Sequence, residues 1–180
     1  MRKLLQAVVA LVLLQVVMGG ITFLAADYRP VAVLVGLGFL ALVWVAGRGF
    51  GRDADPGPGR TAQHGPGRTA AQALLAGLLW QLPGLQGSIR FATDQVGWTA
   101  YDGITDLQDF LMETWHTVLM PLLGVLPAGQ VAHYYARYYI LLVAVSPFLV
   151  LLFACAALSG AVRGRGRQAT APSAGPRRSV

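Results

Sequence analysis

The chain has 180 residues, of which 55% are hydrophobic and only 12% are charged. A soluble domain carries about 25% charged residues, so this composition excludes an ordinary soluble protein and predicts long segments that lie in lipid. Thirteen arginines and one lysine outweigh eight acidic residues to give a formal net charge of +6, and the single cysteine, Cys155, excludes an intramolecular disulfide.

Two apolar runs open the chain. Residues 4–26 follow Arg2 and Lys3, and as a helix they would extend about 34 Å, enough to cross a hydrocarbon core of about 30 Å. A cleaved signal peptide is the alternative interpretation, but the run is long for one and lacks a small-x-small cleavage pattern. Residues 31–47 carry no charge and are near the lower length limit for a span. We therefore predict a transmembrane helical hairpin over residues 1–47.

Residues 48–69 are rich in glycine, proline and arginine and contain two copies of the sequence GPGRTA. This composition is too polar and flexible to pack a core, so it predicts a cytoplasmic loop. Residues 70–89 form a weaker apolar run that is interrupted by glutamines and a proline. Gln72 and Gln81 are nine residues apart, which predicts opposite faces of a helix and no shared polar seam.

The clearest predicted span is residues 138–162, which carry no charge and contain Pro147 as a potential kink. Ala156 and Gly160 stand four residues apart in this run, a spacing that lets helices approach closely. Gly36 and Gly38 in the second span are also small enough to let another helix approach closely. Residues 163–180 are basic and predict a disordered cytoplasmic tail.

The basic residues predict the orientation of the chain. Eleven of the fourteen fall in the N-terminus, the middle loop and the tail, namely Arg2, Lys3, Arg48, Arg52, Arg60, Arg68, Arg163, Arg165, Arg167, Arg177 and Arg178. The positive-inside rule assigns these three regions to the cytoplasmic side, so an even number of crossings must separate the loop from the tail. The rival crossing, residues 98–127, would carry several carboxylates into hydrocarbon. We therefore predict residues 70–89 as the third of four spans.

In this topology, residues 90–137 lie outside the cytoplasm and contain the acidic segment 102–116, DGITDLQDFLMETWH. Its polar residues follow one another at steps of four, three, four and three, which places them within about 80° on a helix, with apolar residues opposite. These residues are Asp102, Asp106, Asp109, Glu113 and His116. The pattern predicts an amphipathic helix with an acidic stripe. Residues 118–127 are apolar but too short to span, which predicts a break or partial re-entry at the outer interface.

The acidic stripe is open to three interpretations. Its acids can simply face water while the apolar side packs on the bundle or the membrane surface. The four carboxylates, Asp102, Asp106, Asp109 and Glu113, can instead form a docking face for a basic partner, or a loose cation site. Thirdly, Asp109, Glu113 and His116, with His133, can bind a single metal, because Glu-x-x-His places both side chains on one helical face. Glu113 is the only glutamate, so a di-iron carboxylate site cannot be completed within one molecule.

The sequence therefore predicts an all-α integral membrane protein with four transmembrane helices and an extracytoplasmic amphipathic helix. We expect it in a bacterial plasma (inner) membrane, with both termini cytoplasmic. Without a nucleotide-binding loop, zinc-protease motif or serine elbow, it is predicted to be non-enzymatic, to need no cofactor and to bind no nucleic acid. The expected role is a subunit, scaffold or accessory factor, with the bilayer and a membrane-protein partner or second copy as partners. The alternative is a metal-dependent membrane enzyme, or a metal or small-solute transport component.

Overall fold

The computed structural model describes residues 1–53, 66–86, 115–123 and 134–169, which are almost entirely helical and contain no strand within these ranges. The long helices are α1 (Arg2–Leu24), α2 (Arg29–Asp53), α3 (Pro66–Trp80) and α7 (Tyr134–Ala169). After α3, Gln81 forms a turn and residues 82–86 are helical again. Two short helices, η1 (Thr117–Leu119) and α6 (Met120–Leu123), precede α7.

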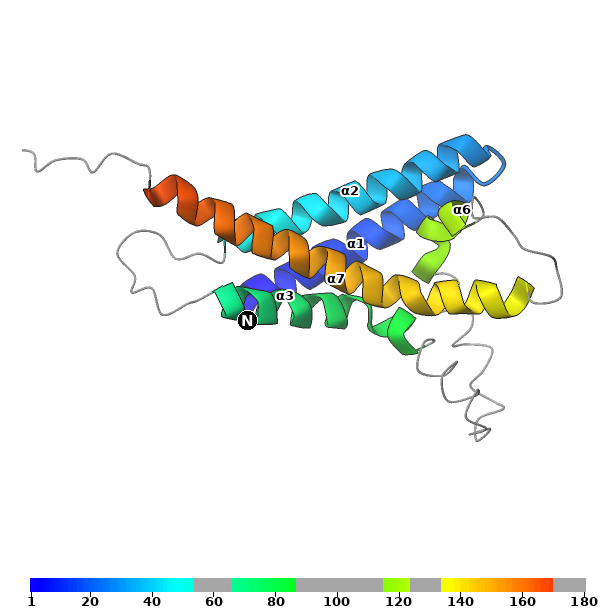
Figure 1. The fold of residues 1–180 in the computed structure, drawn as a ribbon. Coiled ribbons are helices and arrows are strands. Elements are labelled where there is room, and N and C mark those ends of the chain that lie inside the picture. The colour runs from blue at the N-terminus through cyan, green and yellow to red at the C-terminus, as the bar shows by residue number, and fades with distance from the viewer. Residues whose placement is uncertain (54–65, 87–114, 124–133, 170–180) are drawn as a thin grey trace, which may run out of the picture.

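The long helices form a bundle in which α1 and α3 run in one direction and α2 and α7 run in the other (Figure 1). The N-terminus, the end of α2, the start of α3 and the end of α7 therefore lie at one end. We call this the basic end, because it carries Arg2, Lys3, Arg48, Arg52, Arg68 and Arg163. The opposite, far end holds the turn between α1 and α2, the start of α7 and helix α6.

Three helical stretches are long and apolar enough to cross a membrane, namely Arg2–Leu24, Arg29–Arg52 and Ala144–Gly164. They correspond to three of the four predicted spans. Helix α2 continues to Asp53, into the predicted loop, and α7 extends beyond both ends of the predicted span. Pro147 lies inside α7 and does not end it.

The predicted third span, residues 70–89, is not one of the three. Helix α3 has 15 residues and ends at Trp80, so its length is about 22 Å. The predicted amphipathic helix, residues 102–116, lies outside the described residues except for Trp115 and His116, which are helical. Four crossings and the amphipathic helix therefore remain predictions.

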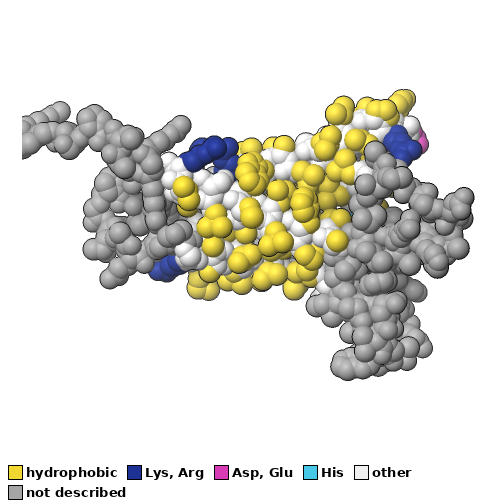
Figure 2. All heavy atoms as spheres, viewed as in Figure 1, with side chains coloured by type: hydrophobic (Ala, Val, Ile, Leu, Met, Phe, Trp, Pro, Cys, Tyr) yellow, Lys and Arg dark blue, Asp and Glu magenta, His cyan; other side chains and the backbone are white. Residues whose placement is uncertain are grey.

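Apolar side chains cover much of the face of the bundle shown in Figure 2, between its two ends. Helix α1 exposes Leu13, Val16 and Val17, although it buries Leu11 on its other side. Helix α3 exposes four leucines, Leu74, Leu75, Leu78 and Leu79. A bundle that is apolar both inside and outside is typical of helices solvated by lipid.

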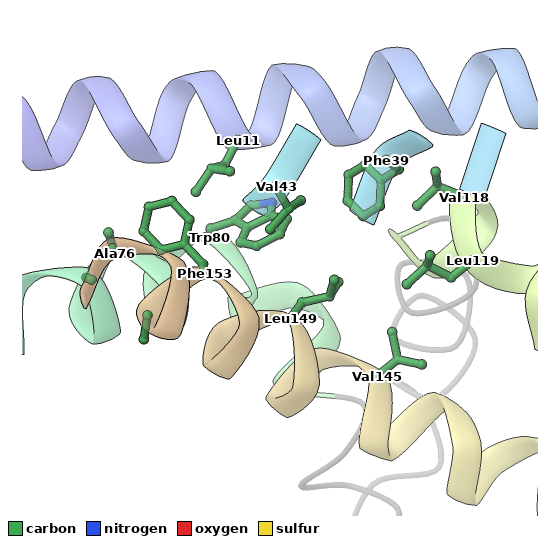
Figure 3. Packing of buried hydrophobic residues seen from close by; sticks show 13 residues of the cluster. Leu11, Phe39, Val43, Ala76, Trp80, Val118, Leu119, Val145, Leu149 and Phe153 are labelled. Carbon is green, nitrogen blue, oxygen red and sulfur yellow. The ribbon is translucent and has the colours of Figure 1, made fainter. Parts of the chain in front are cut away.

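The core contains large side chains from each of the four long helices (Figure 3). Trp80 at the end of α3 is fully buried, and its ring centroid lies 6.3 Å from that of Phe39 on α2. Phe153 and Leu149 of α7 and Leu11 of α1 belong to the same cluster. The short helices belong to the same core, because Val118 and Leu119 are buried.

The segment formed by η1 and α6 packs against α1 and α2. A Cβ atom on Gly36 of α2 would lie 3.0 Å from both the carbonyl oxygen of Val118 and Cγ of Leu122. Gly36 therefore allows a close approach, as the sequence predicted, but to this short segment rather than to another long helix. Gly38 does not allow one, since its nearest neighbour, Met18 Cε, would be 3.9 Å away.

Helices α2 and α7 approach each other through small residues near the basic end. A Cβ atom on Gly51 would lie 1.9 Å from the carbonyl oxygen of Ala157, and one on Gly160 would lie 2.2 Å from that of Arg48. The Cβ of Ala156 lies against Gly47 of α2, so the predicted role of Ala156 and Gly160 in close packing is confirmed. The matching small residues on α2, Gly47 and Gly51, were not predicted.

We predict that Gly51→Ala destabilises the bundle by about 1–3 kcal/mol, because its methyl group would collide with the backbone of α7. Gly49→Ala is the matched control, since a Cβ atom at Gly49 would have no neighbour within 4 Å. Denaturation of the two purified variants by sodium dodecyl sulfate in mixed micelles measures the difference. Equal midpoints for both variants would contradict the contact between α2 and α7.

Candidate functional site

Four polar side chains lie together inside the bundle, although they come from four distant parts of the chain. Gln15 belongs to α1, Gln81 follows α3, Ser146 belongs to α7, and His116 precedes η1. Gln15 is 3% exposed and the other three are 0% exposed. We call these residues, with the carbonyl group of Trp115, the polar ring.

The polar ring is joined by consecutive hydrogen bonds. Gln15 Nε2 donates to the carbonyl oxygen of Trp115. Gln81 Nε2 donates to Gln15 Oε1 at 3.0 Å, and Ser146 Oγ donates to Gln81 Oε1 at 3.0 Å. His116 Nε2 lies 2.7 Å from Ser146 Oγ. Because His116 follows Trp115 directly, these bonds form a closed ring.

The carbonyl of Trp115 determines the direction of the bonds, because a carbonyl oxygen can only accept. Gln15 must therefore direct its amide nitrogen at Trp115 and its oxygen at Gln81. Gln81 in turn directs its nitrogen at Gln15 and its oxygen at Ser146, whose hydroxyl proton is then donated to Gln81. The remaining acceptor position of Ser146 Oγ faces His116, so His116 Nε2 carries a proton and donates it.

This direction decides what the contact between Ser146 and His116 does chemically. A serine nucleophile requires a histidine nitrogen that accepts its proton, with the histidine as general base. In the polar ring the hydroxyl proton of Ser146 goes to Gln81, and His116 Nε2 acts as the donor. The arrangement therefore supports a structural hydrogen-bond network rather than an activated serine.

Gly84, in the helical residues after α3, makes room for the contact between Ser146 and His116. A Cβ atom on Gly84 would lie 2.1 Å from Ser146 Oγ and 2.8 Å from His116 Cε1. Only glycine leaves enough space for both side chains at this point. The backbone of residues 82–86 therefore encloses one side of the polar ring.

The polar ring lies deep between the two ends of the bundle. Gln15 is thirteen residues from Arg2 and Gln81 is thirteen residues from Arg68, which places both about 20 Å along their helices from the basic end. Leu11 and Trp80, both buried, are among the nearby apolar residues. In such surroundings an unpaired polar group costs several kcal/mol, which explains why these side chains satisfy one another.

The structure describes one of the residues proposed for the acidic stripe. His116 is fully buried, and its Nε2 faces Ser146. Asp102, Asp106, Asp109 and Glu113 lie outside the described residues, as does the additional metal candidate His133. Within the described ranges, no three His, Cys, Asp or Glu side chains come together to hold a metal ion.

Sequence reasoning missed the polar ring itself. It placed Gln72 and Gln81 on opposite faces and considered no partner for either. The structure buries Gln81 against Gln15, whereas Gln72 is partly exposed. The sequence did hold one signal that could have paired the two glutamines. Gln15 and Gln81 both stand thirteen residues after an arginine of the basic end, so both lie at the same depth in the bundle.

Comparison of the chain with protein-family models, curated proteins and solved structures finds no match. The class of the protein therefore rests on its own features. It is a helical protein with three helices that are long and apolar enough to cross a membrane. Four of the six buried polar side chains in its described part belong to the polar ring.

We predict that Gln15→Leu destabilises the bundle by about 1–3 kcal/mol, because it leaves the Trp115 carbonyl and Gln81 Nε2 without their partner. Gln6→Leu is the matched control, since Gln6 is an exposed glutamine on the same helix. Detergent denaturation of the purified variants measures both effects. If Gln6→Leu were as destabilising as Gln15→Leu, the polar ring would not contribute to stability.

Proposed function

We propose that this protein is a membrane scaffold or non-catalytic subunit that holds the acidic segment 102–116 at the far end of its bundle for docking to a basic partner. The observation that supports this most directly is the anchoring of Trp115 and His116 in the polar ring. These two residues are the last of the acidic segment. In this proposal the bundle holds the last two residues of the segment, and the preceding residues offer Asp102, Asp106, Asp109 and Glu113 to the partner.

The proposed topology has four crossings with both termini in the cytoplasm. The helix directions support it, because α1 and α3 leave the basic end and α2 and α7 return to it (Figure 1). Helix α3 covers about 22 Å, and the helical residues 82–86 follow it toward the far end (Figure 1). The exposed leucines of α3 are suited to contact with lipid.

The polar ring also supports the retention of residues 1–26 as a membrane helix. Gln15 satisfies both Gln81 and the carbonyl of Trp115. Removal of α1 as a signal peptide would leave these groups unpaired in an apolar core. An uncleaved α1 is therefore part of the proposed architecture.

A metal-dependent role through Asp109, Glu113 and His116 is the alternative. A metal ion bound by His116 Nε2 would have to replace the hydrogen bond to Ser146. It would also have to displace the proton that this nitrogen carries in the bond direction set by the Trp115 carbonyl. No observation on the described residues favours that role. We therefore propose docking, with elemental analysis of the purified protein as the direct check for a bound metal.

The topology predicts a labelling pattern in intact cells. Single cysteines at Gln108, Ala62 and Ala174, each in a Cys155→Ala background, are treated with an impermeant thiol reagent. We expect labelling at position 108 alone, because only that position lies outside the cytoplasm in the proposed arrangement. Labelling at 62 or 174 would contradict it.

The docking role predicts a crosslink that depends on the acids. A photo-crosslinking amino acid at Gln108 should capture a partner, and Asp106→Ala with Asp109→Ala should reduce the yield several-fold, because the charges attract that partner. Ser146→Ala should also reduce the yield, because it releases the anchor at His116. The amount of crosslinked product on a gel measures each effect.

Two controls define what would overturn the docking role. Ser159→Ala removes a hydroxyl that bonds only locally, to the carbonyl of Ala156 at 2.8 Å, and should leave the crosslink intact. A crosslinker at Leu13, which is exposed on α1, reports non-specific capture. An unchanged yield after removal of both acids would show that the segment is not a docking face.

A further inference from the structure

Three arginines lie near the ends of α2 and α7 at the basic end of the bundle. Arg48 and Arg52 are one turn apart on α2, and Arg163 follows Gly160 on α7 by almost one turn. Gly160 lies against the backbone of Arg48, so the two helices are in direct contact at this level. Basic side chains are visible at this end of the bundle in Figure 2.

Among the side chains that the structure describes, the only acidic one, Asp27, lies in the turn after α1 at the far end, so it supplies no counter-charge to these arginines. Nε of Arg48 is shielded from solvent and has no hydrogen-bond partner among the described residues. Arg52 and Arg163 are exposed. A buried guanidinium N–H without an acceptor is costly, so the site calls for an anionic acceptor.

The position of the arginines specifies where that acceptor would come from. The apolar stretches Arg29–Arg52 and Ala144–Gly164 both end at this level. If these helices cross a membrane, Arg52 and Arg163 lie at the boundary between hydrocarbon and headgroups. Phosphate groups of lipids are found at that depth, and arginine binds phosphate oxygens in a bidentate manner.

Apolar residues flank the arginines on the side toward the middle of the bundle. Trp44, one turn before Arg48, is 36% exposed, and Val162, next to Arg163, is 63% exposed. Tryptophan is favoured at the membrane interface, where its ring contacts both acyl chains and headgroups. A ligand with a phosphate head and an acyl tail fits this combination, whereas a free phosphate would use only the arginines.

We propose that Arg48, Arg52 and Arg163 bind the phosphate of an anionic phospholipid at the crossing of α2 and α7. The same arginines also contribute to orientation through their charge during insertion. Binding to the purified, folded protein is independent of insertion. A binding measurement on the folded protein therefore distinguishes a lipid-binding site from arginines that only set the orientation.

The test uses the full-length protein in an uncharged detergent, titrated with phosphatidylglycerol or with phosphatidylcholine and followed by native mass spectrometry. The wild type should bind phosphatidylglycerol more tightly than phosphatidylcholine. Arg52→Gln with Arg163→Gln, and the triple variant that adds Arg48→Gln, should lose about fivefold in affinity for each arginine removed. The double variant changes only exposed side chains, so it should retain the fold.

Arg29→Gln is the control, because it removes the same charge at the far end, and it should leave the affinity unchanged. An equal loss in this variant, or equal binding of the two lipids by the wild type, would overturn the proposal. Inorganic phosphate is added in a parallel titration. Displacement of phosphatidylglycerol by inorganic phosphate at equal concentration would assign the arginines to a free anion and also overturn it.

Discussion

The hydrogen bond from Gln15 to the carbonyl of Trp115 is the constraint on which the rest of the polar ring depends. A carbonyl oxygen has no proton to offer, so its presence assigns the orientation of both glutamines, the donor role of Ser146 and the proton on His116 Nε2. Any other orientation would place two acceptors or two donors against each other. In an apolar interior such a mismatch is expensive, so the ring admits one arrangement and holds four distant segments in it.

The polar ring and the glycine contacts join the helices at different levels of the bundle. Burial of apolar surface cannot by itself associate helices in lipid, because lipid is as apolar as the side chains. Close contact and hydrogen bonding take its place. Gly51 and Gly160 bring α2 and α7 together near the basic end, whereas Gln15, Gln81, Ser146 and His116 join the helices deeper in the bundle.

The long apolar runs were sufficient to predict α1, α2 and α7, because length and the absence of charge are properties of a single helix. They did not predict that α2 continues through Gly49 and Gly51, since that continuation depends on packing against α7. The polar ring was missed for a related reason. The spacing of Gln72 and Gln81 described one helix, but the partner of Gln81 lies on α1, and His116 was grouped with the acids by periodicity although it turns inward to Ser146. Contacts between segments cannot be read from the period of one segment.

Helix α7 connects the two regions for which roles are proposed. It carries Ser146 in the polar ring and Arg163 at the basic end, seventeen residues or about 25 Å apart on one helix. The ring anchors the end of the acidic segment through His116, and Gly160, three residues before Arg163, packs against the backbone of Arg48. A lipid held by these arginines would therefore fix the helix pair that also supports the anchor. The two proposed roles therefore use opposite charges, with arginines for a lipid phosphate and the carboxylates of residues 102–116 for a basic partner.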